Sequence, residues 1–317
     1  MAAAIPYLWE NDDALLQARS VVRDALRGGS GRSLATGFFH AGSNTVSYVV
    51  ADTRSGACAV IDPVLDFDFP TGRTSTAFVD EILRFIDENR MTARWILETH
   101  VHADHLSAAP YLRSTLGCPL GIGSRIWEAQ QAFQVVFNLP SEARPDPRQF
   151  DHLFEDGQEF AVGDLRGLVL HTPGHTPVCA AYVIGDAAFV GDTLFMPDYG
   201  TARADFPGGD ARQLYRSIRR ILSLPLETRI FVCHDYKAQG REEYCWISNV
   251  ESQRSKNIHV QDGVSEDAFV ALRTARDSQL TVPQLFFPSV QVNIHGGSLP
   301  APEANGLQYL RIPLNWL

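Results

Sequence analysis

Three short segments carry six of the ten histidines in this 317-residue chain, and each follows an apolar run typical of a β-strand. The segments are residues 99–105 (THVHADH), 171–176 (HTPGHT) and 233–236 (CHDY). The first places three imidazoles and one carboxylate within six residues. The three imidazoles would repel each other when charged and would need many hydrogen-bond partners when neutral. Borderline divalent metals prefer this mixture of nitrogen and carboxylate oxygen, so the pattern predicts a metal site.

Further candidate ligands come from later strand ends. Asp192 follows the apolar run that ends at Val190, and His234 ends another apolar run. His175 follows a Pro-Gly pair, where the backbone can turn sharply and direct the side chain back to the first segment. His171 is expected to be a hydrogen-bonded residue at a strand end. The remaining histidines receive no role: His40, His152, His259 and His295.

The elements that must position these residues form two β-rich halves. Alternating and apolar runs predict strands at 45–52, 57–62, 94–98, 167–170, 180–184, 187–190 and 229–233. Helical periodicity predicts helices at 75–89, 107–116, 125–136, 210–222 and after residue 251. Two β-rich halves with helices predict an α/β sandwich of two mixed sheets packed face to face, with the helices outside. Asp104 and His105 are expected at the start of the helix that follows the first segment.

The N-terminal part differs from the rest in its pattern. Residues 11–27 predict a short amphipathic helix that is capped by Asn11 and packs on the body or on a partner subunit. A glycine-rich break follows at residues 28–31. We therefore divide the chain into an N-terminal extension, 1–40, and a catalytic domain, 41–317, which includes a C-terminal elaboration.

Composition restricts the classes of function. There are 27 basic and 37 acidic residues, a net charge of −10, so we expect no binding to nucleic acid or to an anionic membrane. No apolar run reaches the roughly 20 residues of a membrane-spanning helix. Five cysteines without a CxxC pair suit a reducing compartment, and the acidic N-terminus is unlike a presequence. We expect a soluble, cytoplasmic protein in which local positive groups capture any anionic substrate.

The order THVHADH, HTPGHT, GDTLF, CHDY resembles the metallo-β-lactamase-fold superfamily over roughly residues 43–251. This resemblance implies an αβ/βα sandwich with the metal at one edge of the two sheets. It also implies seven ligand positions for two metals. Carried over, these are His100, His102 and His175 for one metal, Asp104, His105 and His234 for the other, with Asp192 between them.

Within that superfamily the chain is most similar to persulfide dioxygenases. Asp192 stands where many β-lactamases have a cysteine, and the lack of basic runs disfavours a nuclease. The Arg203-x-Asp-Phe segment and the CHDY segment resemble persulfide dioxygenases more than glyoxalase II enzymes. Residues 196–211 and 290–300 resemble the bacterial β-lactamase-hydrolase-like branch. Thr201-Ala202 departs from the Cys-Gly that animal and plant dioxygenases usually have there.

The resemblance implies one Fe(II) per chain, held by His100, His175 and Asp192, with open coordination positions. The implied reaction oxidises glutathione persulfide with O2 and water to sulfite and glutathione, as in sulfide detoxification. Four further groups would be catalytic, orienting ligands, accepting protons or holding water: His102, Asp104, His105 and His234. The alternative is a glyoxalase II-type hydroxyacylglutathione thioesterase with a dinuclear site. A non-enzymatic alternative is a metal-binding sensor or scaffold that uses the N-terminal helix as its interaction element.

Two residues are candidates for contacts with the substrate. The planar guanidinium of Arg203 suits a substrate carboxylate, although an ion pair with Asp198 or Asp205 would serve a structural purpose. Tyr236 lies two residues after His234 and could donate a hydrogen bond to the substrate. The expected partners are glutathione persulfide and O2, a second copy of the chain in a homodimer, and a sulfurtransferase as a functional link.

Overall fold

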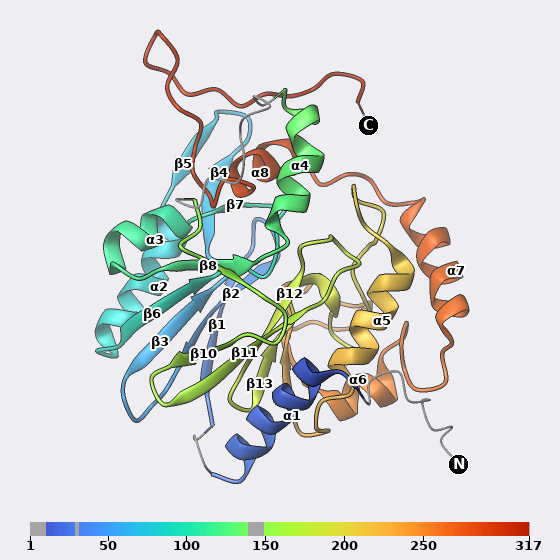
Figure 1. The fold of residues 1–317 in the computed structure, drawn as a ribbon. Helices are drawn as coiled ribbons and strands as arrows, with labels where there is room; N and C mark the ends of the chain where they lie inside the picture. Colours follow the sequence, from blue (N-terminus) through green and yellow to red (C-terminus); the bar gives the residue numbers. More distant parts are fainter. Residues whose placement is uncertain (1–10, 29–31, 139–148, 317) are drawn as a thin grey trace.

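The computed structural model describes residues 11–28, 32–138 and 149–316 and shows two six-stranded sheets packed face to face (Figure 1). Both sheets contain parallel and antiparallel pairs, which confirms the predicted sandwich of two mixed sheets. The first sheet has the order β1 (Leu34–His40), β2 (Thr45–Ala51), β3 (Ala57–Ile61), β6 (Thr92–Leu97), β8 (Leu120–Gly123), β9 (His152–Phe154). The second has the order β10 (Glu159–Val162), β11 (Leu165–His171), β12 (Ala180–Ile184), β13 (Ala187–Phe189), β14 (Arg229–Phe231), β15 (Ile247–Asn249).

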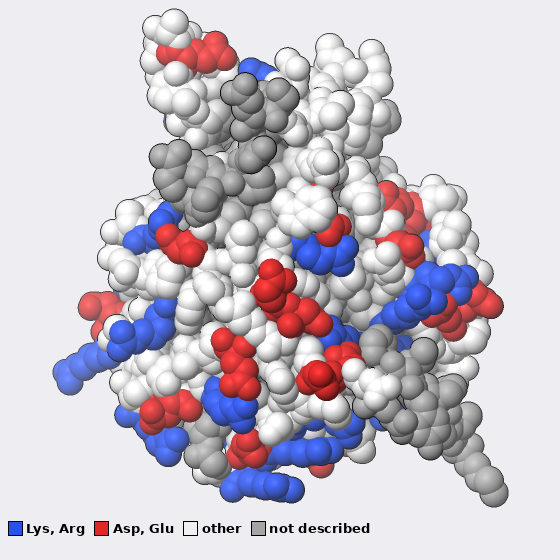
Figure 2. Space-filling model, in the orientation of Figure 1, with Lys and Arg blue, Asp and Glu red and all other residues white. Residues whose placement is uncertain are grey.

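Helices cover the outer faces of the two sheets. The core outside the first sheet includes α2 (Ala77–Glu88), α3 (Ala109–Leu116), α4 (Ile126–Val136) and α8 (Phe286–Asn293). The core outside the second sheet includes α1 (Asp13–Leu26), α5 (Ala211–Ile221), α6 (Val250–Lys256) and α7 (Glu266–Asp277). On the face drawn in Figure 2, basic side chains lie beside acidic ones, so this face presents no broad surface of a single sign.

The alternation of side chains along β2 explains why two cores form. Val46, Tyr48 and Val50 are buried in the core between the sheets, whereas Val49 and Ala51 are buried in the core below the helices. A strand sends successive side chains to opposite faces, so a continuous apolar run is buried on both sides. The strand ends are therefore the places where polar side chains can gather.

The N-terminal helix packs on the body of the protein. Leu15, Ala18 and Val22 of α1 are buried in one cluster with Leu168 and Val183 of the second sheet. The cap of this helix is Asp12, whose side chain accepts from the backbone of Leu15, and not Asn11 as expected. Strand β1 pairs along its length with β2, so residues 34–40 belong to the first sheet. The division into 1–40 and 41–317 stays a prediction, and residues 1–10 lie outside the described part.

The segment that follows β6 differs from the expectation. The chain forms a loop over residues 98–105 and then the short strand β7 (Leu106–Ser107), and α3 begins only at Ala109. Strand β7 pairs with β4 (Val64–Asp68), which pairs with β5 (Arg73–Ser75) in a third sheet. Asp104 and His105 therefore lie in a loop and not at a helix start. In the described ranges, no helix combines the length and the apolar character needed to cross a membrane.

Candidate metal centre

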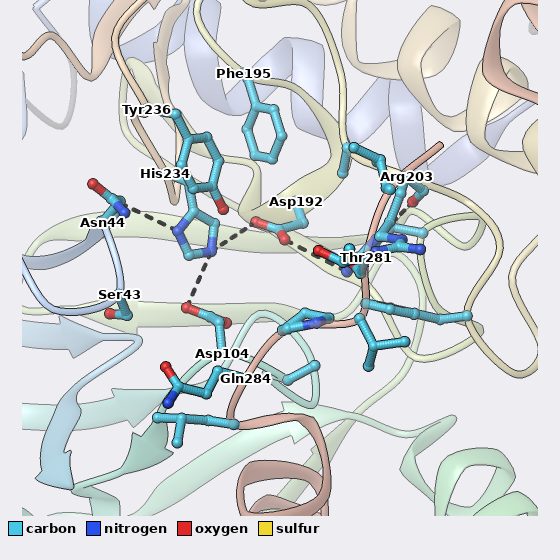
Figure 3. A pocket seen from close by; sticks show the side chains of 18 of the residues that line it. Ser43, Asn44, Asp104, Asp192, Phe195, Arg203, His234, Tyr236, Thr281 and Gln284 are labelled. Atoms are coloured by element: carbon cyan, nitrogen blue, oxygen red, sulfur yellow. Dashed lines mark hydrogen bonds and ion pairs between the residues drawn. The ribbon is translucent and has the colours of Figure 1, made fainter. Parts of the chain in front are cut away.

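Loops that follow β6, β11, β13 and β14 meet at one edge of the sandwich. They bring His100, His175 and His234 around Asp192, which lies in a short 3-10 turn after β13. The Nε2 atoms of His100 and His175 lie 3.8 and 3.5 Å from Asp192 Oδ2. Nε2 of His234 lies 3.3 Å from Asp192 Oδ1 (Figure 3). One ligand atom each of His100, His175 and Asp192 lie within 4.8 Å of one another.

A glycine permits this close approach. Gly191 has a positive φ of 51°, and a Cβ atom there would lie 2.7 Å from Thr99 Oγ1 and 2.8 Å from Thr99 Cβ. Any other residue would push the two loops apart and would also be strained at this φ. The Gly-Asp pair after β13 therefore sets the distance between Asp192 and the loop that carries His100.

Hydrogen bonds fix the orientation of the imidazoles. Nδ1 of His175 donates to the backbone oxygen of Arg203 at 2.7 Å, and Nδ1 of His234 donates to that of Asn44 at 3.2 Å. Because a carbonyl only accepts, the Nε2 atoms carry the free lone pairs that face Asp192. Burial and the neighbouring imidazoles of His102 and His175 hold the pKa of His100 well below its usual value, which favours its neutral form. Neutral imidazoles are the form that binds a metal.

His102 lies in a different environment, between two buried carboxylates. Its Nε2 is 3.0 Å from Asp62 Oδ1 and 3.3 Å from Glu98 Oε2. Burial alone would lower the pKa of His102, but the two carboxylates raise it well above its usual value. Burial raises the pKa of Glu98, whereas His102 holds the pKa of Asp62 low despite burial. Sequence reasoning missed Asp62 and Glu98, although each directly follows an apolar strand as the predicted ligands do.

Asp104 and His105 form the remaining part of the cluster. Asp104 Oδ2 lies 3.2 Å from Nδ1 of His105 and 3.7 Å from Nε2 of His234. It also accepts a hydrogen bond from Thr45 Oγ1 at 2.9 Å. Burial would raise the pKa of Asp104, but the charges of His234 and His105 lower it well below its usual value. Burial and the charge of His102 lower the pKa of His105 to about 4. All seven residues that the resemblance implied as ligands therefore lie in one cluster.

Unpaired polar atoms in this cluster show that its residues fit a metal ion. Nε2 of His105 and Oδ1 of Asp192 are buried and have no hydrogen-bond partner. Buried polar atoms without partners are costly, and folded proteins rarely keep several in one place. A divalent cation would accept the lone pairs of such nitrogen and carboxylate ligands.

A pocket of about 720 Å³ opens above the cluster. Aromatic side chains of Phe195, Tyr199 and Tyr236 line one part of it, and residues 280–285 line another. The ring of Tyr236 stacks on that of His234, with centroids 5.5 Å apart (Figure 3). The predicted substrate contact Tyr236 thus lies in the pocket wall next to the cluster.

The second predicted contact, Arg203, has protein partners. Its Nε and Nη2 atoms lie 2.6 and 2.8 Å from the Asp205 carboxylate, and Nη1 donates to the backbone oxygen of Thr281 at 2.7 Å. The structure therefore shows the ion pair that was the structural alternative for Arg203. The backbone oxygen of Arg203 also accepts a hydrogen bond from the candidate ligand His175. Arg203 therefore connects His175 to the pocket-lining segment 280–285, which its side chain contacts at Thr281.

Arg276 is a pocket residue that sequence reasoning missed. Of the three arginines in the lining, Arg203 contacts Asp205 and Arg273 contacts Asp277. Arg276 is exposed at the end of α7, its Cζ lies 6.0 Å from the ring centroid of Tyr199, and it has no carboxylate partner among the described residues. A basic residue in the last turn of a helix is common, so nothing in the sequence distinguished this arginine.

These features define the class of the protein. The family model of the metallo-beta-lactamase superfamily matches residues 41–234, and the chain belongs to that superfamily. The chain is 51% identical over 289 residues to a probable metallo-hydrolase of Burkholderia pseudomallei, covering 88% of this chain and 98% of the relative. It is 51% identical to a beta-lactamase hydrolase-like protein of Xylella fastidiosa, covering 89% of this chain and 65% of that longer relative.

The persulfide dioxygenase ETHE1 of Homo sapiens is a more distant relative. It is 33% identical over 236 residues, covering 73% of this chain and 78% of the human protein. The crystal structure of ETHE1 from Myxococcus xanthus superposes with a TM-score of 0.65 at 29% identity, covering 84% of this chain and all of that one. The predicted resemblance to the superfamily, including its persulfide dioxygenases and β-lactamase-hydrolase-like members, is confirmed.

Proposed function

We propose that this protein is a persulfide dioxygenase that binds one Fe(II) per chain through His100, His175 and Asp192. The observation that carries the proposal is the grouping of two imidazole nitrogens and one carboxylate oxygen within 4.8 Å. Two histidines and one carboxylate are the ligand set of non-haem Fe(II) oxygenases. The similarity to ETHE1 over 73% of the chain supports the same choice.

An Fe(II) ion held by these three residues would keep open coordination positions and would mediate the transfer of electrons from the persulfide sulfur to dioxygen. The chain's own residues supply the rest. The backbone oxygen of Arg203 holds the proton of His175 on Nδ1, so that Nε2 stays available as a ligand. Asp104 and His234 lie beside the candidate ligands at the floor of the pocket, where they can hold water or accept a proton. Asp62 and Glu98 fix the ring of His102.

The substrate in this proposal is glutathione persulfide, which reacts with O2 and water to give sulfite and glutathione. Glutathione derivatives carry carboxylates, and the protein itself has a net charge of −10. A local cation must therefore bind the substrate, and Arg276 is the arginine of the pocket lining that has no carboxylate partner in the described part. We assign it this contact in place of Arg203. The homodimer, the sulfurtransferase link and the cytoplasmic location stay predictions.

A specific feature favours thioester hydrolysis as the second candidate. Nε2 of His234 lies 3.3 Å from Asp192 and 3.7 Å from Asp104, and Nε2 of His105 has no partner. This arrangement could hold a second metal, and metal-bound water is the nucleophile in dinuclear hydrolases. The hydrolase names of the two most similar relatives described above agree with it.

Metal analysis and two parallel assays on one preparation separate the candidates. The dioxygenase proposal expects about one iron per chain and sulfite release from glutathione persulfide. Near two zinc ions per chain, with rapid cleavage of S-lactoylglutathione and no sulfite from the persulfide, would replace it with the thioesterase.

A further inference from the structure

We infer that Asn293, the last residue of α8, is a positioning residue for the metal centre, because it holds the backbone of the loop that carries the histidine cluster. Asn293 begins the segment 293–297 (NIHGG), which lies outside residues 41–234, the part that the family model matches. Neither the dioxygenase nor the thioesterase proposal uses this residue. Its role requires the metal centre of the proposed function but not a particular reaction there.

Three hydrogen bonds join the side chain of Asn293 to the chain around the cluster. Nδ2 donates to the backbone oxygen of His102 at 2.9 Å and to that of His105 at 2.7 Å. Oδ1 accepts from the backbone N–H of Ser107 at 2.8 Å. Only one orientation of the amide satisfies all three partners, because carbonyl oxygens accept and an N–H donates. Asn293 therefore fixes the backbone on both sides of Asp104.

These hydrogen bonds lie in the interior of the protein. Asn293 is 5% exposed, and the residues whose backbone it contacts, His102, His105 and Ser107, are buried as well. Residues 98–105 form neither a strand nor a helix, so the loop has no regular ladder of backbone hydrogen bonds. Buried backbone groups without partners are costly. Without the amide, the two carbonyl groups would have to turn toward other donors, and the loop would move with them.

A movement of this loop would reach the candidate ligands. The ring centroid of His102 lies 4.1 Å from that of His100 and 4.3 Å from that of His105. The hydroxyl of Ser107 donates to Glu98, and Glu98 Oε2 lies 3.3 Å from Nε2 of His102. The loop backbone and these side chains therefore cannot shift independently of one another.

The segment after α8 comes very close to the loop. Figure 1 shows α8 beside β7, the strand that follows the loop. Gly297 has a positive φ of 81°, and a Cβ atom there would lie 2.8 Å from the backbone oxygen of Ser107 and 2.7 Å from Cδ of Pro110. Any other residue would push the segment away and would be strained at this φ. Gln130 of α4 donates to the backbone oxygen of Ile294 at 2.7 Å, so the segment is also held from the other side.

A leucine variant separates positioning from other effects, because leucine has nearly the shape of asparagine, carries no charge and makes no hydrogen bond. The probe is Co(II), which binds the same kinds of ligand as other divalent metals and absorbs visible light according to the arrangement of those ligands. Asn293→Leu should lower the affinity for Co(II) on the order of tenfold or more, as the loss of hydrogen-bonding partners around a metal site does. The absorption of the bound Co(II) should change as well.

Asn257→Leu is the matched control. Asn257 is completely buried, and its side chain donates to the backbone oxygen of Gly200 and to Gln253. It also accepts from the backbone N–H groups of His259 and Val260. Both leucine variants should lower the melting temperature of the metal-free protein, but the control should keep the wild-type affinity for Co(II) and its absorption.

Wild-type affinity and absorption in Asn293→Leu would overturn the inference, and so would an equal change in the control. If Asn293→Leu does not fold, Gly297→Ala tests the same contact, because its methyl group should push the segment from Ser107 and weaken Co(II) binding; unchanged binding would then overturn the inference. Gly157→Ala is the control for this variant, since Gly157 has a φ of 78° and its Cβ would meet Ala14 of α1. No binding of Co(II) by the wild type would contradict the metal centre itself and, with it, this role.

Discussion

Asp104 and Asp192 are the same kind of side chain in two different environments. Asp192 faces the Nε2 atoms of His100 and His175, whereas Asp104 accepts a hydrogen bond from Thr45 and lies beside His105. The one-metal proposal makes only Asp192 a ligand.

Asparagine at each position tests that difference, because it keeps the shape and removes the charge. We expect Asp192→Asn to lose its metal after dialysis and Asp104→Asn to keep it, although with lower activity. Elemental analysis of the two dialysed proteins measures the outcome. Equal loss in both variants would instead indicate two metals that share the cluster.

Arg276 allows a prediction about substrate binding at the scale of one residue. Arg276→Gln should raise KM for a glutathione substrate roughly tenfold, about 1.4 kcal/mol of binding free energy, because the substrate carboxylate loses its partner. The value of kcat should stay close to that of the wild type. Arg212→Gln is the control, since Arg212 pairs with Glu266 outside the pocket. A larger rise in KM for Arg203→Gln than for Arg276→Gln would return the contact to Arg203.

At the scale of elements, the sequence predicted most of what places the metal cluster. The strands that precede His100, Asp192 and His234 were predicted from their apolar runs. In the structure these are β6, β13 and β14. Strands of three residues or fewer, such as β7 and β14, depend on partners that are distant in sequence, so local patterns do not fix their bounds. The sequence left open whether Arg203 contacts the substrate or pairs with an aspartate such as Asp205. Which partner a side chain meets depends on the folded backbone, so the sequence pattern alone did not decide between them.

Helix α1 is joined to the body by an ion-pair cluster, in addition to its apolar contacts, and this cluster should respond to pH. Arg220 of α5 contacts Asp12 at the helix cap and Asp156 of the body. Burial alone would raise the pKa of Asp12, but hydrogen bonds from Arg220 and from the backbone of Leu15 lower it below its usual 3.8. The folded state therefore binds fewer protons than the unfolded state, and stability increases with pH in this range. The Asp12 carboxylate stabilises the folded state fully above about pH 4. This stabilisation is lost as the pH falls through the lowered pKa of Asp12 in the folded state.

Hydrogen exchange measures this effect on α1. We expect the amides of residues 15–26 to exchange faster below pH 4, relative to those of β12, than they do at neutral pH. In Arg220→Ala they should already exchange faster at neutral pH, with a loss of roughly 2 kcal/mol of stability, since a partly buried ion pair loses one partner. Slow exchange of α1 in that variant would show that apolar packing alone holds the helix.

At the scale of the whole molecule, the metal cluster joins the two sheets. His100 follows a strand of the first sheet, whereas His175, Asp192 and His234 follow strands of the second. A bound metal therefore links both halves of the sandwich, and it stabilises the folded state by mass action. At a free metal concentration about 100 times Kd the gain is about 2.7 kcal/mol.

Removal of the metal should lower the melting temperature by several degrees. Scanning calorimetry with and without a chelator measures the shift, and re-addition of Fe(II) should reverse it. Asp192→Asn should melt at the same temperature with and without the chelator. A wild-type protein that the chelator does not affect would contradict the proposed link between the halves.

Oxygen uptake is the most direct test of the proposed reaction. Protein loaded with Fe(II) is given glutathione persulfide in an oxygen electrode, and sulfite is measured in the same sample. The dioxygenase proposal predicts one O2 consumed for each sulfite formed, and no sulfite under anaerobic conditions. No oxygen uptake with the persulfide, together with rapid hydrolysis of S-lactoylglutathione, would contradict it.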